Sequence, residues 1–264
     1  RIRKRLSLDS RLRKAVEKEA FTIYYQPRVD AATRKVESME ALVRWIDDDG
    51  TIIPPGDFIS LAEENGLIVP IGEWVLDKAL SDLHRWLPLD PSLKVSVNLS
   101  ARQFRLPDLE SRIVSSIEVS GVPAGSLELE ITESLAMADV NHSISILTSL
   151  NSRGVSFSLD DFGTGYSSLY YLHHLPIQWL KIDQTFVREI RSSPESQGNA
   201  IVITIIEMAR NLGLRTIAEG CETTEQHEFL TRHGCEQIQG FLFSKPIPAN
   251  DFERLIGTSL EALP

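Results

Sequence analysis

The feature that most constrains the fold of this 264-residue chain is a regular alternation of strand-like and helix-like segments. Short runs rich in β-branched and aromatic residues are separated by stretches with helical periodicity. The eight strand candidates are Phe21–Gln26, Val36–Val43, Lys94–Leu99, Leu127–Thr132, Val155–Leu159, Trp179–Ile182, Arg215–Ala218 and Ile238–Phe243. Strands interleaved with helices indicate a parallel sheet, and this number of strands at this length predicts an α/β fold, a TIM-like (β/α)8 barrel.

One connection breaks the alternation. Only a short polar stretch lies between Gln26 and Val36, which is too short for a crossover helix. The first two strands should therefore form an antiparallel hairpin, so that the barrel has an antiparallel first strand. Because no linker or repeat interrupts the pattern, we expect residues 20–264 to form one domain.

The preceding segment, residues 1–19, has a different composition. Its first 14 residues hold seven lysines or arginines and a single acid. Apolar residues recur among these charges at near-helical spacing, namely Ile2, Leu6, Leu12 and Val16. One interpretation is a solvated helix that connects residues 20–264 to an upstream region; the other is a segment that binds anions or a membrane surface.

Charge and cysteine content narrow the choice of partner and compartment. The formal net charge is −10, and the chain beyond the basic segment is more acidic still. Such a body should repel nucleic-acid phosphates, so we expect no binding to a DNA or RNA polymer. Two cysteines, no signal peptide and no apolar run of membrane length favour a cytoplasmic setting. An anionic ligand would then need local positive charge, for which metal ions are the natural source.

Polar residues mark the carboxyl ends of the candidate strands, where the active site of a barrel is built. They are Gln26, Glu40 with Arg44, Asn98, Glu130, Asp160 with Asp161, Lys181 with Asp183, Glu219, and Gln239. Carboxylate and amide oxygens are hard ligands that suit Mg²⁺ or Mn²⁺. None of the six histidines falls at a strand end, which disfavours a zinc hydrolase.

The adjacent pair Asp160 and Asp161 is the sharpest local signal. Neighbouring residues of a strand point to opposite faces, so both carboxylates reach one site only if the chain turns, and Gly163 and Gly165 allow this. Two such carboxylates can hold two cations roughly 3.5 to 4 Å apart, the arrangement that assists in-line phosphoryl displacement. The alternative is a helix N-cap followed by a turn.

Two basic residues fit the same chemistry. Strand alternation places Lys181 and Asp183 on one face, where the lysine could orient a water or form a structural ion pair. Arg44 is placed to hold a phosphate oxygen. Gly220 could similarly allow Glu219 and Glu222 to face the site together.

At these residues the sequence resembles the EAL-domain family of cyclic di-GMP phosphodiesterases, over nearly all of residues 20–256. The shared motifs are Tyr25-Gln26-Pro27, Glu40-Ala41-Leu42-Val43-Arg44-Trp45, Asn98-Leu99-Ser100, Glu130-Ile131-Thr132-Glu133, Asp160-Asp161-Phe162-Gly163-Thr164-Gly165-Tyr166-Ser167-Ser168, Lys181-Ile182-Asp183, Glu219-Gly220-Cys221-Glu222 and Gln239-Gly240-Phe241. Each motif is weak alone, but all of them occur in the family order. Cys221 stands where the family usually has a small aliphatic residue.

The resemblance implies a role for each of these positions. One divalent ion would be held by Glu40, Asn98, Glu130 and Asp160, and a second by Asp160, Asp161 and Glu219. Lys181 and Glu219 resemble the pair that orients and deprotonates the attacking water. The positions implied to contact the nucleotide or shape its site are Gln26, Leu42, Arg44, Asp183, Glu222 and Gln239. Glu133 resembles the residue that anchors the loop after Asp161, which the family links to homodimerisation.

The expected function is therefore the hydrolysis of cyclic di-GMP to linear pGpG with two Mg²⁺ or Mn²⁺ ions. Residues 1–19 resemble the segment that joins such a domain to an upstream sensor or GGDEF region, which predicts an N-terminal regulatory domain. Two alternatives remain at this stage: a catalytically silent cyclic di-GMP receptor, and a barrel hydrolase for another phosphodiester.

Overall fold

A computed structural model describes residues 2–163, 169–191 and 197–261. Its strands form one ten-stranded sheet, in which eight strands close the predicted barrel. The barrel strands are β1 (Phe21–Asp30), β2 (Val36–Ile46), β4 (Lys94–Asn98), β5 (Leu127–Thr132), β6 (Ser156–Phe162), β7 (Trp179–Ile182), β8 (Arg215–Ala218) and β9 (Gln237–Ile238). Two short strands lie outside the barrel: β3 (Ile52–Ile53) pairs antiparallel with β2, and β10 (Ile247–Pro248) pairs antiparallel with β1.

The predicted antiparallel first strand is confirmed. Strand β1 runs antiparallel to β2 on one side and to β9 on the other, so it closes the barrel. The other pairings between neighbouring barrel strands are parallel, which brings the carboxyl ends of β2 and β4 to β9 to one rim.

The last predicted strand, Ile238–Phe243, is wrong beyond Ile238. The chain turns at Gly240, where the N–H groups of Phe243 and Ser244 both donate to the Gly240 carbonyl. A Cβ at Gly240 would lie 2.0 Å from the carbonyl oxygen of Cys221, so this crossing of two loops requires glycine. The close approach places the segment after Gln239 over the barrel mouth instead of along its wall.

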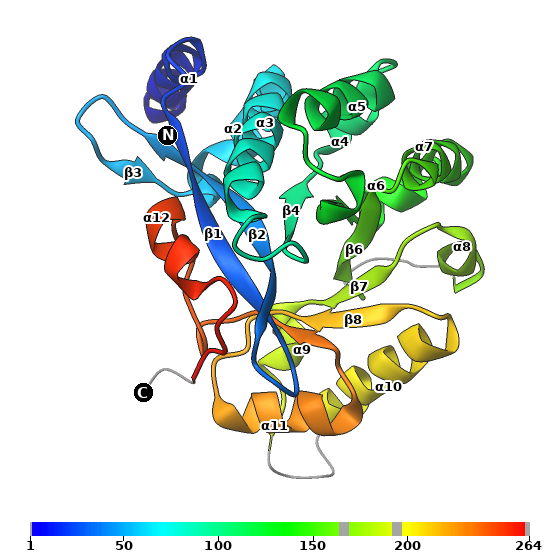
Figure 1. Cartoon of the computed structure of the whole chain (residues 1–264). Helices are drawn as coiled ribbons and strands as arrows, with labels where there is room; N and C mark the ends of the chain where they lie inside the picture. Colours follow the sequence, from blue (N-terminus) through cyan, green and yellow to red (C-terminus); the bar gives the residue numbers. More distant parts are fainter. Residues whose placement is uncertain (1, 164–168, 192–196, 262–264) are drawn as a thin grey trace.

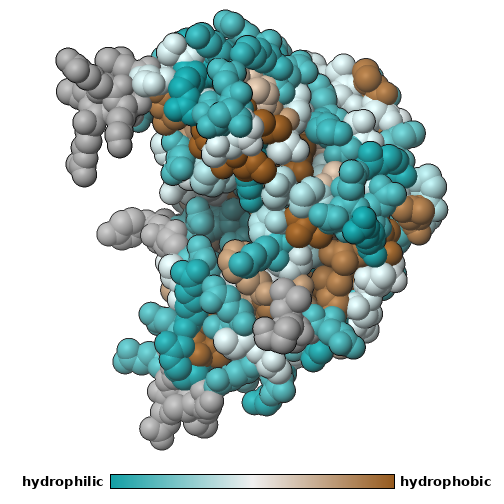
Figure 2. Space-filling view, turned by 90° about the vertical axis from the view of Figure 1, so that its left-hand side faces the viewer, coloured by the Kyte–Doolittle hydropathy of each residue, from teal (hydrophilic) through white to brown (hydrophobic). Residues whose placement is uncertain are grey.

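Helices surround the strands (Figure 1) and bury the apolar outer face of the sheet. The helices over the described residues are α1 (Ile2–Glu17), α2 (Pro55–Asn65), α3 (Ile68–Trp86), α4 (Ala101–Phe104), α5 (Leu109–Ser120), α6 (Glu133–Ala138), α7 (Val140–Ser152), α8 (Leu169–His174), α9 (Gln184–Val187), α10 (Gln197–Asn211), α11 (Thr224–His233) and α12 (Ala249–Phe252). Ala124–Ser126 and Glu253–Leu255 form 3-10 turns. Hydrophilic residues cover most of the face in Figure 2, with small apolar patches between them.

The N-terminal helix α1 is present, but it packs on the barrel and is not solvated on all sides. Leu12 and Ala15 are buried in the main core. Arg11 forms an ion pair with Asp47 and stacks over the Trp45 ring at 5.4 Å. These contacts dock α1 against the end of β2, beside the β3 hairpin in Figure 1. Among the described residues, we find no helix with the length and hydropathy needed to cross a bilayer.

Candidate active site

A cleft of about 290 Å³ opens at the carboxyl ends of the barrel strands. It is lined by Gln26, Glu40, Leu42, Asp160, Lys181, Gln184, Arg188, Glu219, Gly220, Glu222, Gln239, Gly240, Phe241 and Pro246. A larger groove of about 400 Å³ is lined by residues of α10 and α11 and by Arg191, but this groove does not contain the acidic residues of the strand ends. The strand-end cleft is therefore the candidate active site.

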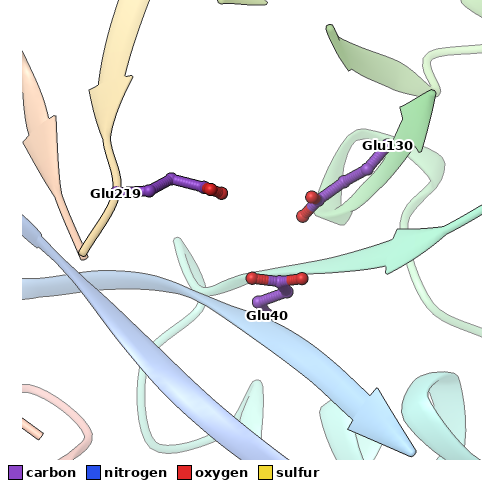
Figure 3. A group of neighbouring side chains, drawn as sticks. All are labelled: Glu40, Glu130 and Glu219. Atoms are coloured by element: carbon purple, nitrogen blue, oxygen red, sulfur yellow. The ribbon is translucent and has the colours of Figure 1, made fainter. Parts of the chain in front are cut away.

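Three glutamates from distant parts of the chain converge here: Glu40 and Glu219 line the cleft, and Glu130 is buried beside them. Glu40 comes from β2, Glu130 from β5 and Glu219 from the residue after β8, and their carboxylates point toward one another in Figure 3. One oxygen from each lies within 4.8 Å of one from each of the others. Three converging carboxylates are a suitable oxygen ligand set for a hard divalent cation. The structure thus brings together three of the predicted metal-binding residues.

Lys181 lies at the centre of this cluster and is 1% exposed. Its Nζ is 3.1 Å from Oδ2 of Asp160 and 2.5 Å from Oε1 of Glu219, and it also contacts Glu130. Burial opposes the charge on the lysine, but the surrounding carboxylates outweigh it and hold the pKa of Lys181 well above its ordinary value. Lys181 is therefore an ammonium ion that can donate hydrogen bonds and neutralise negative charge.

The glutamates differ in their affinity for protons. Burial raises the pKa of Glu219 to about 8, with Asp160 and Glu40 adding to the effect against Lys181. Burial also raises the pKa of Glu40, and the nearby Glu130 adds to it. In Glu130 the effect of burial is outweighed by Arg28 and Lys181, which lower its pKa to about 2. In the absence of another cation, Glu130 carries the most persistent negative charge of the three.

A chain of amides holds Glu40 in place. Asn98 donates from Nδ2 to Oε1 of Glu40 at 2.8 Å, and Gln239 donates from Nε2 to Oε2 of Glu40 at 2.7 Å. The same nitrogen of Gln239 lies 2.9 Å from Oε1 of Gln26. The predicted residues Asn98 and Gln239 therefore bond the Glu40 carboxylate directly, and Gln26 bonds Gln239.

The backbone turns at the aspartate pair, but of the two only Asp160 is among the described residues that line the cleft, so the shared site stays a prediction. Asp161 has a positive φ of 56°, and its backbone N–H donates to Oδ1 of Asp160 at 2.9 Å. Burial and the neighbouring Asp160 and Asp183 raise the pKa of Asp161. Thr164 to Ser168, which complete this motif, lie outside the described residues.

Glu133 has the contact expected of a loop anchor. It is 2% exposed at the start of α6, and its Oε2 accepts a hydrogen bond from the backbone N–H of Gly163 at 3.0 Å. The bond ties the end of β6 to α6.

The predicted substrate-binding residues fall into two groups. Gln26, Leu42, Glu222 and Gln239 line the cleft, whereas Arg44 and Asp183 are not among the described residues that line it. Arg44 donates to the carbonyl of Val43 at 2.9 Å and lies over the Tyr24 ring. Asp183 caps α9 by accepting from the backbone N–H of Thr185 at 2.9 Å. Substrate contact by Arg44 or Asp183 stays a prediction.

Several residues of the site were missed by the sequence analysis. Arg188 lines the cleft and lies 3.4 Å from Glu222, and Phe241 lines it from the loop after Gln239 with 48% of its surface exposed. Arg28 is fully buried beneath the glutamates and contacts Glu130. Strand alternation could have revealed Arg28, because it follows Gln26 by two residues on β1.

Known proteins similar to this chain include two that are named as cyclic di-GMP phosphodiesterases. The bifunctional diguanylate cyclase/cyclic di-GMP phosphodiesterase MucR of Pseudomonas aeruginosa is 44% identical over 92% of the chain, and the cyclic di-GMP phosphodiesterase PdeR of Escherichia coli is 41% identical over 94%. The matched regions are 36% and 37% of those proteins, so the chain spans about a third of the length of its curated relatives.

A solved structure described as the PaMucR phosphodiesterase in complex with c-di-GMP superposes with a TM-score of 0.89 at 43% identity. The match covers 93% of this chain and 99% of that one. The EAL domain family model matches residues 9–246. The chain therefore belongs to the EAL domain family.

Proposed function

We propose that this chain hydrolyses cyclic di-GMP to linear pGpG. The observation that carries the proposal is the convergence of Glu40, Glu130 and Glu219 at the strand-end cleft, where Lys181 contacts Glu130 and Glu219. Relatives named as cyclic di-GMP phosphodiesterases, and the similar structure described as a c-di-GMP complex, support the choice of substrate. Since the relatives are about three times as long, the activity of a whole protein containing this chain is part of the proposal.

The residues of the cleft fit a divalent metal centre. Carboxylates from β2, β5 and the residue after β8, with the Asn98 amide beside Glu40, form a donor set of oxygen ligands that suits Mg²⁺ or Mn²⁺. We propose Glu40, Asn98, Glu130 and Asp160 as ligands of one ion, and Asp160, Asp161 and Glu219 as ligands of a second. When bound, such ions would supply positive charge that stabilises the phosphoryl group during displacement.

The side chains of the chain itself suggest how the reaction would proceed. Hydrolysis forms a bond between a water oxygen and phosphorus and breaks one phosphorus–O3′ bond, and the leaving 3′ oxygen takes up a proton from solvent. Glu219 is the proposed base that takes the proton of this water. Lys181 is bonded to both Glu219 and Asp160, so it holds the base in position and offsets negative charge that develops nearby.

The cleft also suggests where the nucleotide would lie. Gln26, Leu42, Glu222 and Gln239 line it and are the proposed substrate contacts. We also propose contacts from Arg44 and Asp183, although neither lines the cleft among the described residues. The aromatic ring of Phe241 and the guanidinium of Arg188 add an apolar surface and a positive charge to the same cleft. These groups suit a ligand that carries both bases and phosphates.

The test is incubation of the purified chain with cyclic di-GMP and Mg²⁺ or Mn²⁺, with products separated by chromatography and an EDTA control. Metal-dependent formation of pGpG is the expected result. Binding without consumption would instead indicate a silent receptor. Equal consumption of other cyclic dinucleotides would indicate a different phosphodiesterase.

We further propose that α1 connects this domain to an N-terminal regulatory domain, that the protein is a homodimer, and that this domain lies in the cytoplasm, whether or not an upstream region anchors the full-length protein to a membrane. The greater length of the relatives supports the first point. The second predicts a dimer mass by light scattering at high concentration, and a monomer there would contradict it.

A further inference from the structure

Arg28 occupies a layer of the barrel directly below the candidate active site. It lies on β1 two residues beyond Gln26, so the two side chains share the inner face of the strand. The same spacing relates four other buried residues to the site residues above them: Ser38 to Glu40, Ser96 to Asn98, Glu128 to Glu130, and Ser158 to Asp160. Arg28 is 0% exposed, so it acts on the cleft only through other side chains.

The guanidinium of Arg28 has three partners. Its Nη1 lies 2.8 Å from Oε1 of Glu128, its Nη2 contacts Oε1 of Glu130, and its Nε donates to Oε1 of Gln239 at 2.9 Å. The planar fork of donors in arginine suits such a contact set, whereas a lysine presents a single charged nitrogen. One buried side chain thereby joins β1, β5 and the residue after β9.

These contacts reach two of the three clustered glutamates. Glu130 is held directly. Glu40 is held through Gln239, because Arg28 donates to the amide oxygen and thereby leaves the amide nitrogen to donate to Oε2 of Glu40 at 2.7 Å. If this amide were reversed, its oxygen would face the carboxylate of Glu40 and repel it. Arg28 therefore determines which end of Gln239 faces the cleft.

The buried ion pair between Arg28 and Glu128 is not needed to stabilise a fold of this kind. Barrel interiors are commonly filled by branched apolar side chains, and replacing a buried ion pair by well-packed apolar residues is often neutral or stabilising. Arg28 and Glu128 form a buried ion pair in the barrel interior, at positions where apolar side chains are common in this fold. The guanidinium does, in contrast, contact Glu130 directly and is linked to Glu40 through Gln239.

We propose that Arg28 is a positioning residue for the metal centre, fixing Glu130 directly and Glu40 through Gln239. This inference rests on the proposed function, since it assumes that these glutamates bind a divalent ion. Groups that orient metal ligands from behind commonly contribute about 10- to 100-fold to metal affinity.

The test measures Mn²⁺ binding to the purified chain by electron paramagnetic resonance of free Mn²⁺, without substrate. Arg28→Lys keeps the charge but loses the fork, and we expect it to weaken Mn²⁺ binding about tenfold or more. Arg215→Lys is the matched control, because Arg215 stacks on Trp179 at the amino-terminal ends of β7 and β8, whereas the cleft lies at the carboxyl ends of the strands. The Arg215→Lys variant should bind Mn²⁺ with a Kd within about twofold of wild type. If Arg28 served folding alone, Arg28→Lys would lower the Tm and leave the Kd for Mn²⁺ unchanged.

A second variant guards against misfolding. Arg28→Met combined with Glu128→Leu removes the buried pair without changing the net charge, and the same loss of Mn²⁺ affinity is expected. A folded Arg28 variant with wild-type affinity would overturn the positioning role while leaving the proposed function intact. Failure of the wild-type chain to bind Mn²⁺ would reject the metal centre and this inference together. If neither variant folds, Arg28 is a structural residue and the positioning role is rejected.

Discussion

The ammonium nitrogen of Lys181 lies 3.1 Å from Oδ2 of Asp160, inside a ring of carboxylates at the barrel mouth. The lysine is almost fully buried, and its charge is sustained by Asp160, Glu130 and Glu219. Lys181 is therefore a fixed cationic partner of Glu219, the proposed base.

Lys181→Met should lower kcat by about 100-fold or more, because the substitution removes both the hydrogen bond to Glu219 and the local positive charge. The measurement is steady-state pGpG formation at saturating Mn²⁺, with circular dichroism to verify folding. A folded variant that retains more than a third of wild-type turnover would contradict the assignment.

Glu40→Ala should abolish turnover by weakening metal binding, since it removes one carboxylate of the cluster. We expect a rise of about tenfold or more in the Kd for Mn²⁺, together with loss of pGpG formation. Glu37→Ala is the matched control on the same strand, because Glu37 is exposed and bonds Gln237 away from the cluster. Similar Mn²⁺ affinity in the two variants would refute Glu40 as a ligand.

Glu133→Ala should release the end of β6 by removing the acceptor for the Gly163 N–H. Loss of a hydrogen bond to a charged acceptor predicts faster exchange of that amide by about tenfold. Hydrogen exchange of a peptide covering 156–163 measures this, and Glu133→Gln, which keeps an acceptor, should show a smaller change. Unchanged exchange in Glu133→Ala would show that the contact does not restrain the loop.

The buried His227 predicts a loss of stability in mild acid. Burial lowers its pKa in the folded chain, while the hydrogen bond to the Ala31 carbonyl at 2.9 Å opposes this shift. Among the described residues, the buried Nδ1 atom has no hydrogen-bond partner, so protonation would add an unsatisfied donor there.

Because the unfolded chain binds this proton more readily, His227 contributes stability above about pH 6.5 that is lost as the pH falls toward the lower folded-state value. The difference in Tm between pH 8 and pH 5 should therefore be smaller in His227→Gln than in the wild type. An equal difference in both proteins would exclude His227 as a source of the pH dependence.

Leu12→Ala should destabilise the chain by about 2 to 5 kcal/mol, because Leu12 is fully buried between α1 and the barrel. Chemical denaturation measures the free energy of unfolding. Ser10→Ala, on the exposed face of the same helix, should change it by less than about 0.5 kcal/mol. An equal effect of the two substitutions would indicate that α1 does not pack on the barrel in solution.

The sequence by itself determined the order of strands and helices and the residues that meet at the barrel mouth. Periodicity places the strands, and a connection too short for a crossover forces β1 to be antiparallel. Since parallel strands deliver their carboxyl ends to one rim, the sequence alone is enough to group Glu40, Glu130 and Glu219.

The tertiary structure decided which of these side chains face the cleft and which have local partners. Asp183 caps a helix, and Arg44 bonds the carbonyl of the preceding residue, Val43. These outcomes depend on side-chain rotamers and on the loop path and not on spacing. Strand β9 ends at Ile238 because the next loop passes close to another one, with Gly240 against the backbone of Cys221. No local sequence pattern predicts that these two loops cross. The contacts of Arg28 likewise require β1 and β5 to face each other across the barrel, because no local rule relates residues 102 positions apart.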